Sequence, residues 1–153
     1  MWFSALFGKE PSSETEQRLR GVLERAPQAR KGRILAVDDE SLQTRVISMA
    51  LSRSGHEIDV ATTGEEAWEL LRREPYDCII MDVKMPGMSG TELFRQLQSS
   101  YKELARRVIF VTGDTLNAET RELLESSGGR WLGKPYKLDE LERQVQACLA
   151  EAR

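Results

Sequence analysis

From residue 33 onward, short apolar runs alternate with longer amphipathic stretches, and this alternation constrains the fold more than any other feature. Chains in which strands alternate with helices build parallel sheets whose faces are covered by the helices. We therefore predict an α/β fold. Its five expected strands are residues 34–37, 58–61, 78–81, 108–111 and 131–132.

Each apolar run is followed by an amphipathic stretch, in which apolar residues recur at helical spacing, as at Leu138, Leu141 and Val145. A helix of this kind buries one face against a sheet. Five such units predict a (βα)5 domain. Its expected helices are residues 42–53, 65–73, 92–98, 118–125 and 138–150.

The strand order follows from how apolar each run is. Runs 34–37 and 78–81 are the most apolar and the least alternating, as expected of central strands that are covered on both faces. Asp59 interrupts the second run, which indicates an edge strand. These features suit a flavodoxin-like, five-stranded parallel sheet of order 2-1-3-4-5, whose sites lie beyond the carboxyl ends of the strands.

The length of 153 residues suits one compact domain with a short extension. We expect residues 1–32 to be an N-terminal extension or linker, and residues 33–153 to be the domain. Within the extension, an apolar stripe over residues 19–26 stops at Pro27 and predicts a short amphipathic helix. A loosely ordered tail, or the remnant of an upstream domain, is the alternative.

Composition and charge narrow the functional classes. A chain with 40% hydrophobic and 31% charged residues is typical of a soluble globular protein. Residues 34–153 hold 15 Lys and Arg against 21 Asp and Glu, which disfavours direct nucleic-acid binding. The sequence shows no transmembrane segment or cleavable signal, so a cytoplasmic location is the default expectation.

The cysteines and the histidine carry no motif of their own. Cys78 and Cys148 lack the spacing of metal ligands, and we expect two buried, reduced thiols. The sole histidine, His56, follows Gly55 at the end of the first predicted helix, and we expect it at the surface.

Polar side chains stand where the predicted strands end, namely Asp38, Asp39, Asp82, Thr112 and Lys134. In a parallel sheet they can converge on one crevice. Three close carboxylates need a cation to stay ionised, and an oxygen-only ligand set suits Mg²⁺, with Mn²⁺ as a substitute. A carboxylate beside such an ion can attack phosphorus, while Lys134 and Thr112 can contact phosphoryl oxygens.

These residues lie within motifs of a known family: VDDE at 37–40, MDVKMPGMSG at 81–90, VTG at 111–113 and KP at 134–135. On these motifs, the chain resembles the receiver domain of bacterial response regulators over about residues 33–151. The resemblance covers most of the chain, and the combination of motifs is highly specific.

The resemblance implies a role for each residue of the cluster. Asp82 is expected to accept a phosphoryl group, which Lys134 would contact. Asp38 and Asp39 are expected to hold Mg²⁺ together with Asp82 and the backbone carbonyl of Lys84.

The resemblance also implies positions for switching and tuning. Thr112 would be a switch hydroxyl that moves toward the phosphate. Trp131 would be the switch aromatic, at a position where most members have Tyr or Phe, and a plain core Trp is the alternative. Lys84 and Asp114 match positions that tune the lifetime of the acyl phosphate.

The implied function is phosphorelay signal transduction. A histidine kinase, a histidine phosphotransfer protein or a small phosphodonor would supply the phosphoryl group. The protein is expected to be a switch that assists its own phosphorylation and dephosphorylation, and not an enzyme. Because the sequence ends at Arg153, just after the last predicted helix, we expect output through a downstream protein that contacts the face of the fourth and fifth helices.

The sequence leaves some other functions open and disfavours others. A C-terminal receiver fragment of a hybrid sensor histidine kinase, a homodimer and a phosphorylation-independent scaffold stay open as alternatives. An aspartyl phosphatase or mutase would need a second acid where Lys84 stands. A flavodoxin-type cofactor binder is disfavoured because Asp38, Asp39 and Glu40 would repel a phosphate.

Overall fold

The computed structural model describes residues 13–14, 17–18, 31–113, 117–126 and 130–151. The helix predicted over residues 19–26 therefore lies outside the described residues, and so does Asp114. Nearly all of the predicted domain is described.

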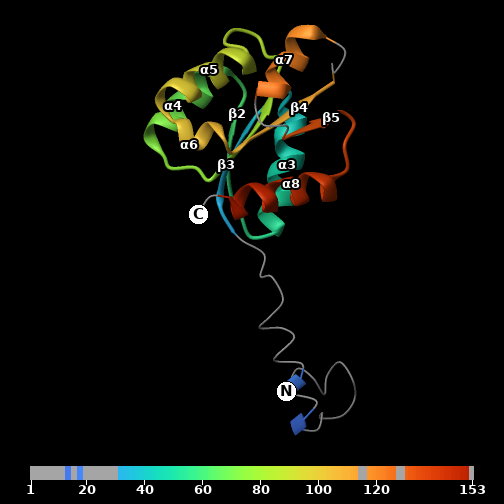
Figure 1. Cartoon of the computed structure of the whole chain (residues 1–153). Coiled ribbons are helices and arrows are strands. Elements are labelled where there is room, and N and C mark those ends of the chain that lie inside the picture. Colours follow the sequence, from blue (N-terminus) through green and yellow to red (C-terminus); the bar gives the residue numbers. More distant parts are fainter. Residues whose placement is uncertain (1–12, 15–16, 19–30, 114–116, 127–129, 152–153) are drawn as a thin grey trace.

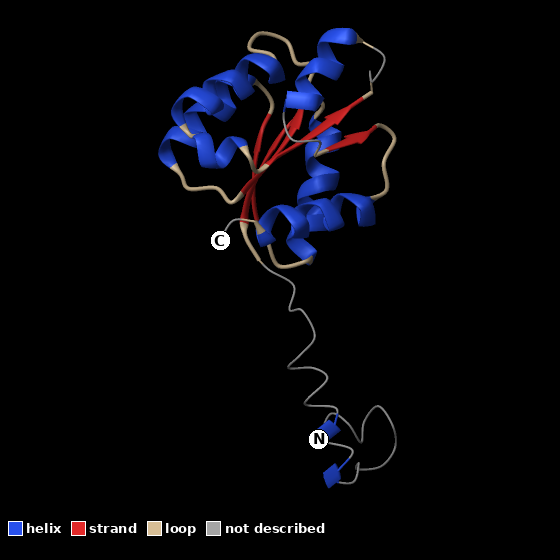
Figure 2. Ribbon diagram, in the orientation of Figure 1, coloured by secondary structure: helices blue, strands red, loops and turns tan. Residues whose placement is uncertain are grey.

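Five strands form one parallel sheet in the order β2-β1-β3-β4-β5 (Figures 1 and 2). The flavodoxin-like order predicted from the sequence is confirmed, with each strand within one residue of its expected start. The strands are β1 (Arg33–Val37), β2 (Glu57–Ala61), β3 (Cys78–Asp82), β4 (Val108–Thr112) and β5 (Trp131–Gly133).

Six helices accompany the sheet between residues 31 and 151, one more than the five predicted. The additional helix, α6, has four residues, too few to show a helical repeat in the sequence. No helix among the described residues is long and apolar enough to cross a membrane. The helices are α3 (Ser41–Arg53), α4 (Gly64–Arg73), α5 (Gly90–Ser100), α6 (Lys102–Ala105), α7 (Ala118–Ser126) and α8 (Leu138–Ala150).

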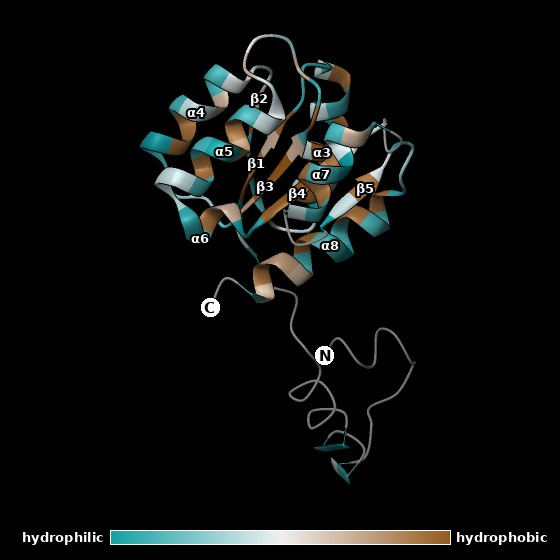
Figure 3. Cartoon of the chain, turned by 45° about the horizontal axis from the view of Figure 1, so that its top comes forward, coloured by the Kyte–Doolittle hydropathy of each residue, from teal (hydrophilic) through white to brown (hydrophobic). Residues whose placement is uncertain are grey.

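The helices cover both faces of the sheet, and each face has its own apolar core (Figure 3). Side chains from α4, α5, α6 and α7 pack against one face, and side chains from α3 and α8 pack against the other. Every residue of β3 and β4 is buried, which confirms the central place predicted for β3. Cys78 and Cys148 are both buried, and neither is in a disulfide.

The edge strand β2 carries the acid that marked it in the sequence. Asp59 accepts a hydrogen bond from the Tyr76 hydroxyl at 2.6 Å and pairs with Arg33 at 3.0 Å. Arg33 also lies over the Tyr76 ring, 5.3 Å from its centroid. These partners satisfy the Asp59 carboxylate, which belongs to the middle of β2 and not to the carboxyl ends of the strands.

The prediction that His56 lies at the surface is wrong. His56 is 7% exposed, because the chain that enters β1 passes over it and the Gly32 N–H donates to its Nδ1 at 3.1 Å. Burial lowers the pKa of His56; nearby Lys31 lowers it further, and Glu142 opposes the shift. His56 is therefore held neutral, with Nδ1 as an acceptor.

This arrangement predicts a pH dependence of stability. Because the pKa of His56 is lowered in the folded chain, the unfolded chain binds the proton more readily as the pH falls below about 6.5. We expect the free energy of unfolding to fall between pH 7.5 and pH 5, by at most about 1.4 kcal/mol for each pH unit below about 6.5, because the unfolded chain takes up one proton that folded His56 resists. Urea unfolding of the wild type and of His56→Asn, whose amide oxygen can accept the same bond, measures it. Equal pH slopes for both proteins would contradict the prediction.

Candidate functional site

Three carboxylates meet at the carboxyl edge of the sheet. Asp38 and Asp39 directly follow β1, and Asp82 is the last residue of the neighbouring strand β3. One oxygen from each of the three lies within 4.8 Å of the others. Asp38 and Asp82 are buried, at 4% and 8% exposure, whereas Asp39 is exposed. The convergence predicted from the strand ends is confirmed for these acids.

Lys134 reaches the cluster from the loop after β5. Its backbone N–H donates to the Thr112 carbonyl at 2.8 Å, which extends the pairing of β4 and β5 by one step. Its Nζ lies 3.2 Å from Asp38 Oδ2 and 3.1 Å from Asp82 Oδ2. The ammonium group therefore sits between the two buried carboxylates.

Backbone amides fix the other oxygen of each buried carboxylate. The Glu40 N–H donates to Asp38 Oδ1 at 3.0 Å, and the Lys84 N–H donates to Asp82 Oδ1 at 3.2 Å. Each carboxylate is thus held between a backbone donor and Lys134. Side chains held in this way need little reorganisation when a ligand binds.

Opposing influences act on the pKa values of both Asp82 and Lys134. Burial raises the pKa of Asp82, and the neighbouring charge of Asp38 adds to this, while hydrogen bonds from Lys134 and the Lys84 N–H work against it. For Lys134, burial alone would lower the pKa, but the Asp82 hydrogen bond and both carboxylates outweigh burial and raise it. Lys134 is therefore cationic at neutral pH, and one cation faces three acids.

That charge balance suits a hard divalent cation. The donors are carboxylate oxygens alone, they come from neighbouring strand ends, and one of them is exposed to solvent. Oxygen donors with room for water ligands are what Mg²⁺ prefers. The residues present therefore fit the metal predicted from the sequence.

The predicted switch residues lie on β4 and β5. Thr112, the last residue of β4, is 1% exposed and lies one step beyond Val111, the partner of Asp82 in the sheet. Trp131 is the first residue of β5 and pairs with Phe110, two residues before Thr112. Its exposed fraction is 38%. The alternative of a plain core tryptophan is therefore wrong.

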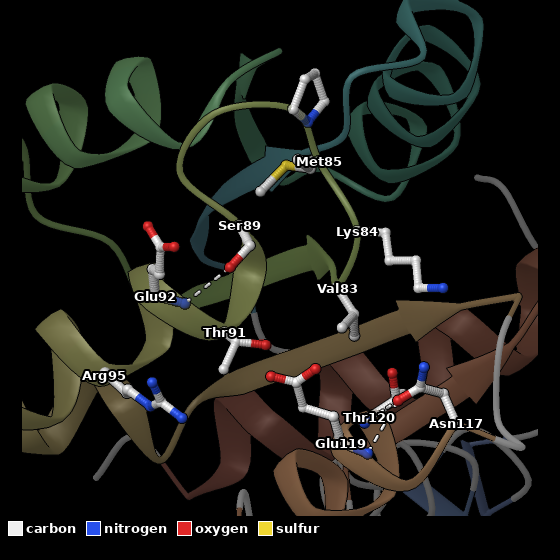
Figure 4. Close-up of a pocket in the computed structure, with 11 residues that line it drawn as sticks. Val83, Lys84, Met85, Ser89, Thr91, Glu92, Arg95, Asn117, Glu119 and Thr120 are labelled. Carbon is white, nitrogen blue, oxygen red and sulfur yellow. Dashed lines mark hydrogen bonds between the residues drawn. The ribbon is translucent and has the colours of Figure 1, made fainter.

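The loop after Asp82 is shaped by Gly90. A Cβ on Gly90 would lie 2.4 Å from the Asp82 carbonyl oxygen, so the start of α5 sits directly against the end of β3. A side chain at this position would not fit, and glycine is the residue that allows so close an approach. Beside the loop lies a hollow of about 440 Å³, with Lys84 and Ser89 on one side and Glu119 of α7 on the other (Figure 4).

Sequence reasoning missed two features of this region. The hollow brings part of the 81–90 motif next to the start of α7, and nothing in the sequence predicted that these two segments meet. Glu65, at the start of α4, accepts a hydrogen bond from the Met88 N–H at 2.9 Å and so contacts the loop after Asp82. Its place in an ordinary amphipathic helix gave no sign of this contact.

A doubly wound parallel sheet with an acid cluster and a lysine at its carboxyl edge defines the receiver class of two-component signalling proteins. The sequence model of the family described as response regulator receiver domain matches residues 34–146. The chain belongs to this family.

Similar proteins include regulators and a kinase. The response regulator MprA of Mycobacterium leprae is 32% identical over 121 residues, which cover 79% of this chain and 52% of MprA. The sensor histidine kinase GacS of Pseudomonas protegens is 31% identical over 134 residues, or 86% of this chain and 15% of GacS. The chain thus spans about half the length of the first curated relatives that it matches.

A solved structure shares both fold and sequence. The response regulator TrrA of Thermotoga maritima, solved in complex with Mg²⁺ and BeF, superposes with a TM-score of 0.66 at 33% identity. The match covers 76% of this chain and 98% of TrrA. Receiver domains bind Mg²⁺ at an acidic pocket, and Asp38, Asp39 and Asp82 form a group of acids in this chain.

Proposed function

We propose that Asp82 accepts a phosphoryl group and that the protein is a phosphorelay switch. The observation that carries the proposal is the position of Asp82 Oδ2, 3.1 Å from Lys134 Nζ within a cluster of three acids. A carboxylate oxygen of Asp82 attacks phosphorus, so an O–P bond forms while the bond from phosphorus to the donor nitrogen or oxygen breaks. The leaving group departs with that electron pair, and Lys134 stays protonated beside the transferred oxygens.

The proposed metal ligands are Asp38, Asp39, Asp82 and the backbone carbonyl of Lys84, with Mn²⁺ able to replace Mg²⁺. Bound Mg²⁺ supplies charge neutralisation and in-line geometry at phosphorus. Asp82 is aimed by the Lys84 N–H, and Asp38 by the Glu40 N–H. These hydrogen bonds orient the two carboxylates for metal binding and phosphoryl transfer in the proposed reaction.

The proposed switch uses Thr112 and Trp131. The hydroxyl of Thr112 moves toward the phosphoryl group, and the exposed Trp131 changes its packing on β5. The readout surface is then formed by α7, β5 and α8, where a downstream protein binds. Lys84 and Asp114 tune the attack of water on the acyl phosphate.

The proposed phosphodonor is a histidine kinase or a histidine phosphotransfer protein. Residues 33–153 are the proposed receiver, and residues 1–32 an extension or linker. A second candidate for the whole protein is a hybrid sensor histidine kinase of which this chain is the receiver, and the similarity to part of GacS supports it. A separate switch protein and a hybrid-kinase receiver would both accept a phosphoryl group on Asp82. A phosphorylation-independent scaffold would not need this reaction.

The direct test is phosphoryl uptake from a small donor. The chain is incubated with acetyl phosphate and Mg²⁺, and intact mass and tryptophan fluorescence are recorded. We expect one phosphoryl group per chain, with uptake abolished by EDTA and restored by Mg²⁺ or Mn²⁺, because the acids need a cation to receive an anionic group. Trp131→Phe serves as the fluorescence control. A chain that takes up no phosphoryl group from acetyl phosphate or from a phosphohistidine protein would overturn the proposal.

A further inference from the structure

We propose that Glu65 is a positioning residue for the loop that carries Lys84, and that it thereby strengthens the binding of Mg²⁺. The inference rests on the proposed function, in which the Lys84 carbonyl is a metal ligand. Glu65 belongs to α4, apart from the strand ends that supply the acids. It acts on the metal through the loop and not as a ligand.

The two ends of this loop, residues 83–89, are tied to the end of β3. The Gly90 N–H donates to the Val83 carbonyl at 3.0 Å, and the Lys84 N–H donates to Asp82 Oδ1 at 3.2 Å. Gly90 allows this closure because a Cβ there would lie 2.4 Å from the Asp82 carbonyl oxygen. The loop therefore leaves the strand and returns to it at fixed points.

The second half of the loop contacts the first turn of α4. The Met88 N–H donates to Glu65 Oε1 at 2.9 Å. Gly87, at φ 74°, is in the left-handed region, and a Cβ on it would lie 3.0 Å from the same oxygen. A Cβ on Gly64 would lie 2.4 Å from the Met88 carbonyl oxygen. The loop and the helix therefore fit closely, and the Glu65 carboxylate is the hydrogen-bonding group at this contact.

Lys84 makes the tie to Asp82 through its own N–H, and Met88, four residues later, makes the tie to Glu65. A loop held at both points loses less conformational freedom when a carbonyl within it binds a metal. Glu65 itself is exposed. It does not cap α4, since the Thr63 hydroxyl accepts a hydrogen bond from the Glu66 N–H at 3.1 Å and is the N-cap. Removal of the Glu65 side chain therefore frees the loop while the helix keeps its cap.

The test compares Mg²⁺ affinity by calorimetric titration in four proteins: wild type, Glu65→Ala, Glu65→Gln and Glu69→Ala. Glu65→Ala should weaken binding about two- to tenfold, the factor that corresponds to one ordinary hydrogen bond. Glu65→Gln keeps an acceptor oxygen and should stay within about twofold of wild type. Glu69→Ala removes an exposed carboxylate from the same helix and should leave the affinity unchanged.

Amide exchange at Met88 reads the hydrogen bond directly. We expect faster exchange in Glu65→Ala than in wild type, and near wild-type exchange in Glu65→Gln. Equal weakening by both variants would show that the charge of Glu65 acts on the metal and not its hydrogen bond to the loop. Either that result or unchanged affinity in Glu65→Ala would overturn the inference. A wild-type chain that binds no Mg²⁺ would instead overturn the proposed function.

Discussion

Replacement of Asp82 by Asn is expected to abolish phosphoryl uptake from acetyl phosphate completely. The amide has nearly the same shape and keeps an oxygen to accept the Lys84 N–H, which now lies 3.2 Å from Asp82 Oδ1. An amide has no ionised oxygen to attack phosphorus, so no acyl phosphate can form. Intact mass after incubation with Mg²⁺ and acetyl phosphate measures the effect.

The matched control for this variant is Asp139→Asn. Asp139 lies on α8, its side chain is 73% exposed, and its partner is Arg143 on the same helix. The control removes one carboxylate from the chain but should accept the phosphoryl group as wild type does. An adduct that persists in folded Asp82→Asn would move the phosphoacceptor to another residue, with Asp38 and Asp39 as the first candidates.

The fold was predictable because its main signals are local. A strand that is buried on both faces, such as β3, is apolar at nearly every position, and Asp59 marks the edge of the sheet. Short elements were less predictable. Helix α6 has four residues and no visible repeat, so it was missed. His56 was misplaced because its burial depends on Gly32, which the fold brings over it from the other end of a βα unit.

The site was predictable to the extent that it lies at strand ends. Parallel strands present their carboxyl ends at one edge, so the sequence alone groups Asp38, Asp82 and Lys134. The sequence did not predict how each side chain is held. The backbone donors to the acids depend on loop conformation, and Glu65 meets Met88 through a contact between two separate βα units.

Lys134→Ala is expected to separate metal binding from phosphoryl transfer. The Lys134 ammonium lies 3.2 Å from Asp38 Oδ2 and 3.1 Å from Asp82 Oδ2. In the proposed function, it stabilises charge on the transferring oxygens. Loss of one such donor typically slows a reaction by about 10²–10³-fold, and we expect phosphoryl uptake to slow by that factor. Mg²⁺ affinity should stay equal or rise, because a like charge that shares the same carboxylates is gone.

Two further variants give this prediction its control. Lys137→Ala removes an exposed lysine close by in the sequence and should phosphorylate at the wild-type rate. Lys134→Arg keeps the charge in a larger, planar group and should retain more activity than Lys134→Ala. Rates of uptake by intact mass, with Mg²⁺ titrated calorimetrically on the same proteins, measure both effects. If Lys134→Ala instead lost metal binding and phosphorylation in parallel, Lys134 would be acting by holding Asp38 and Asp82 in place and not on the phosphoryl group.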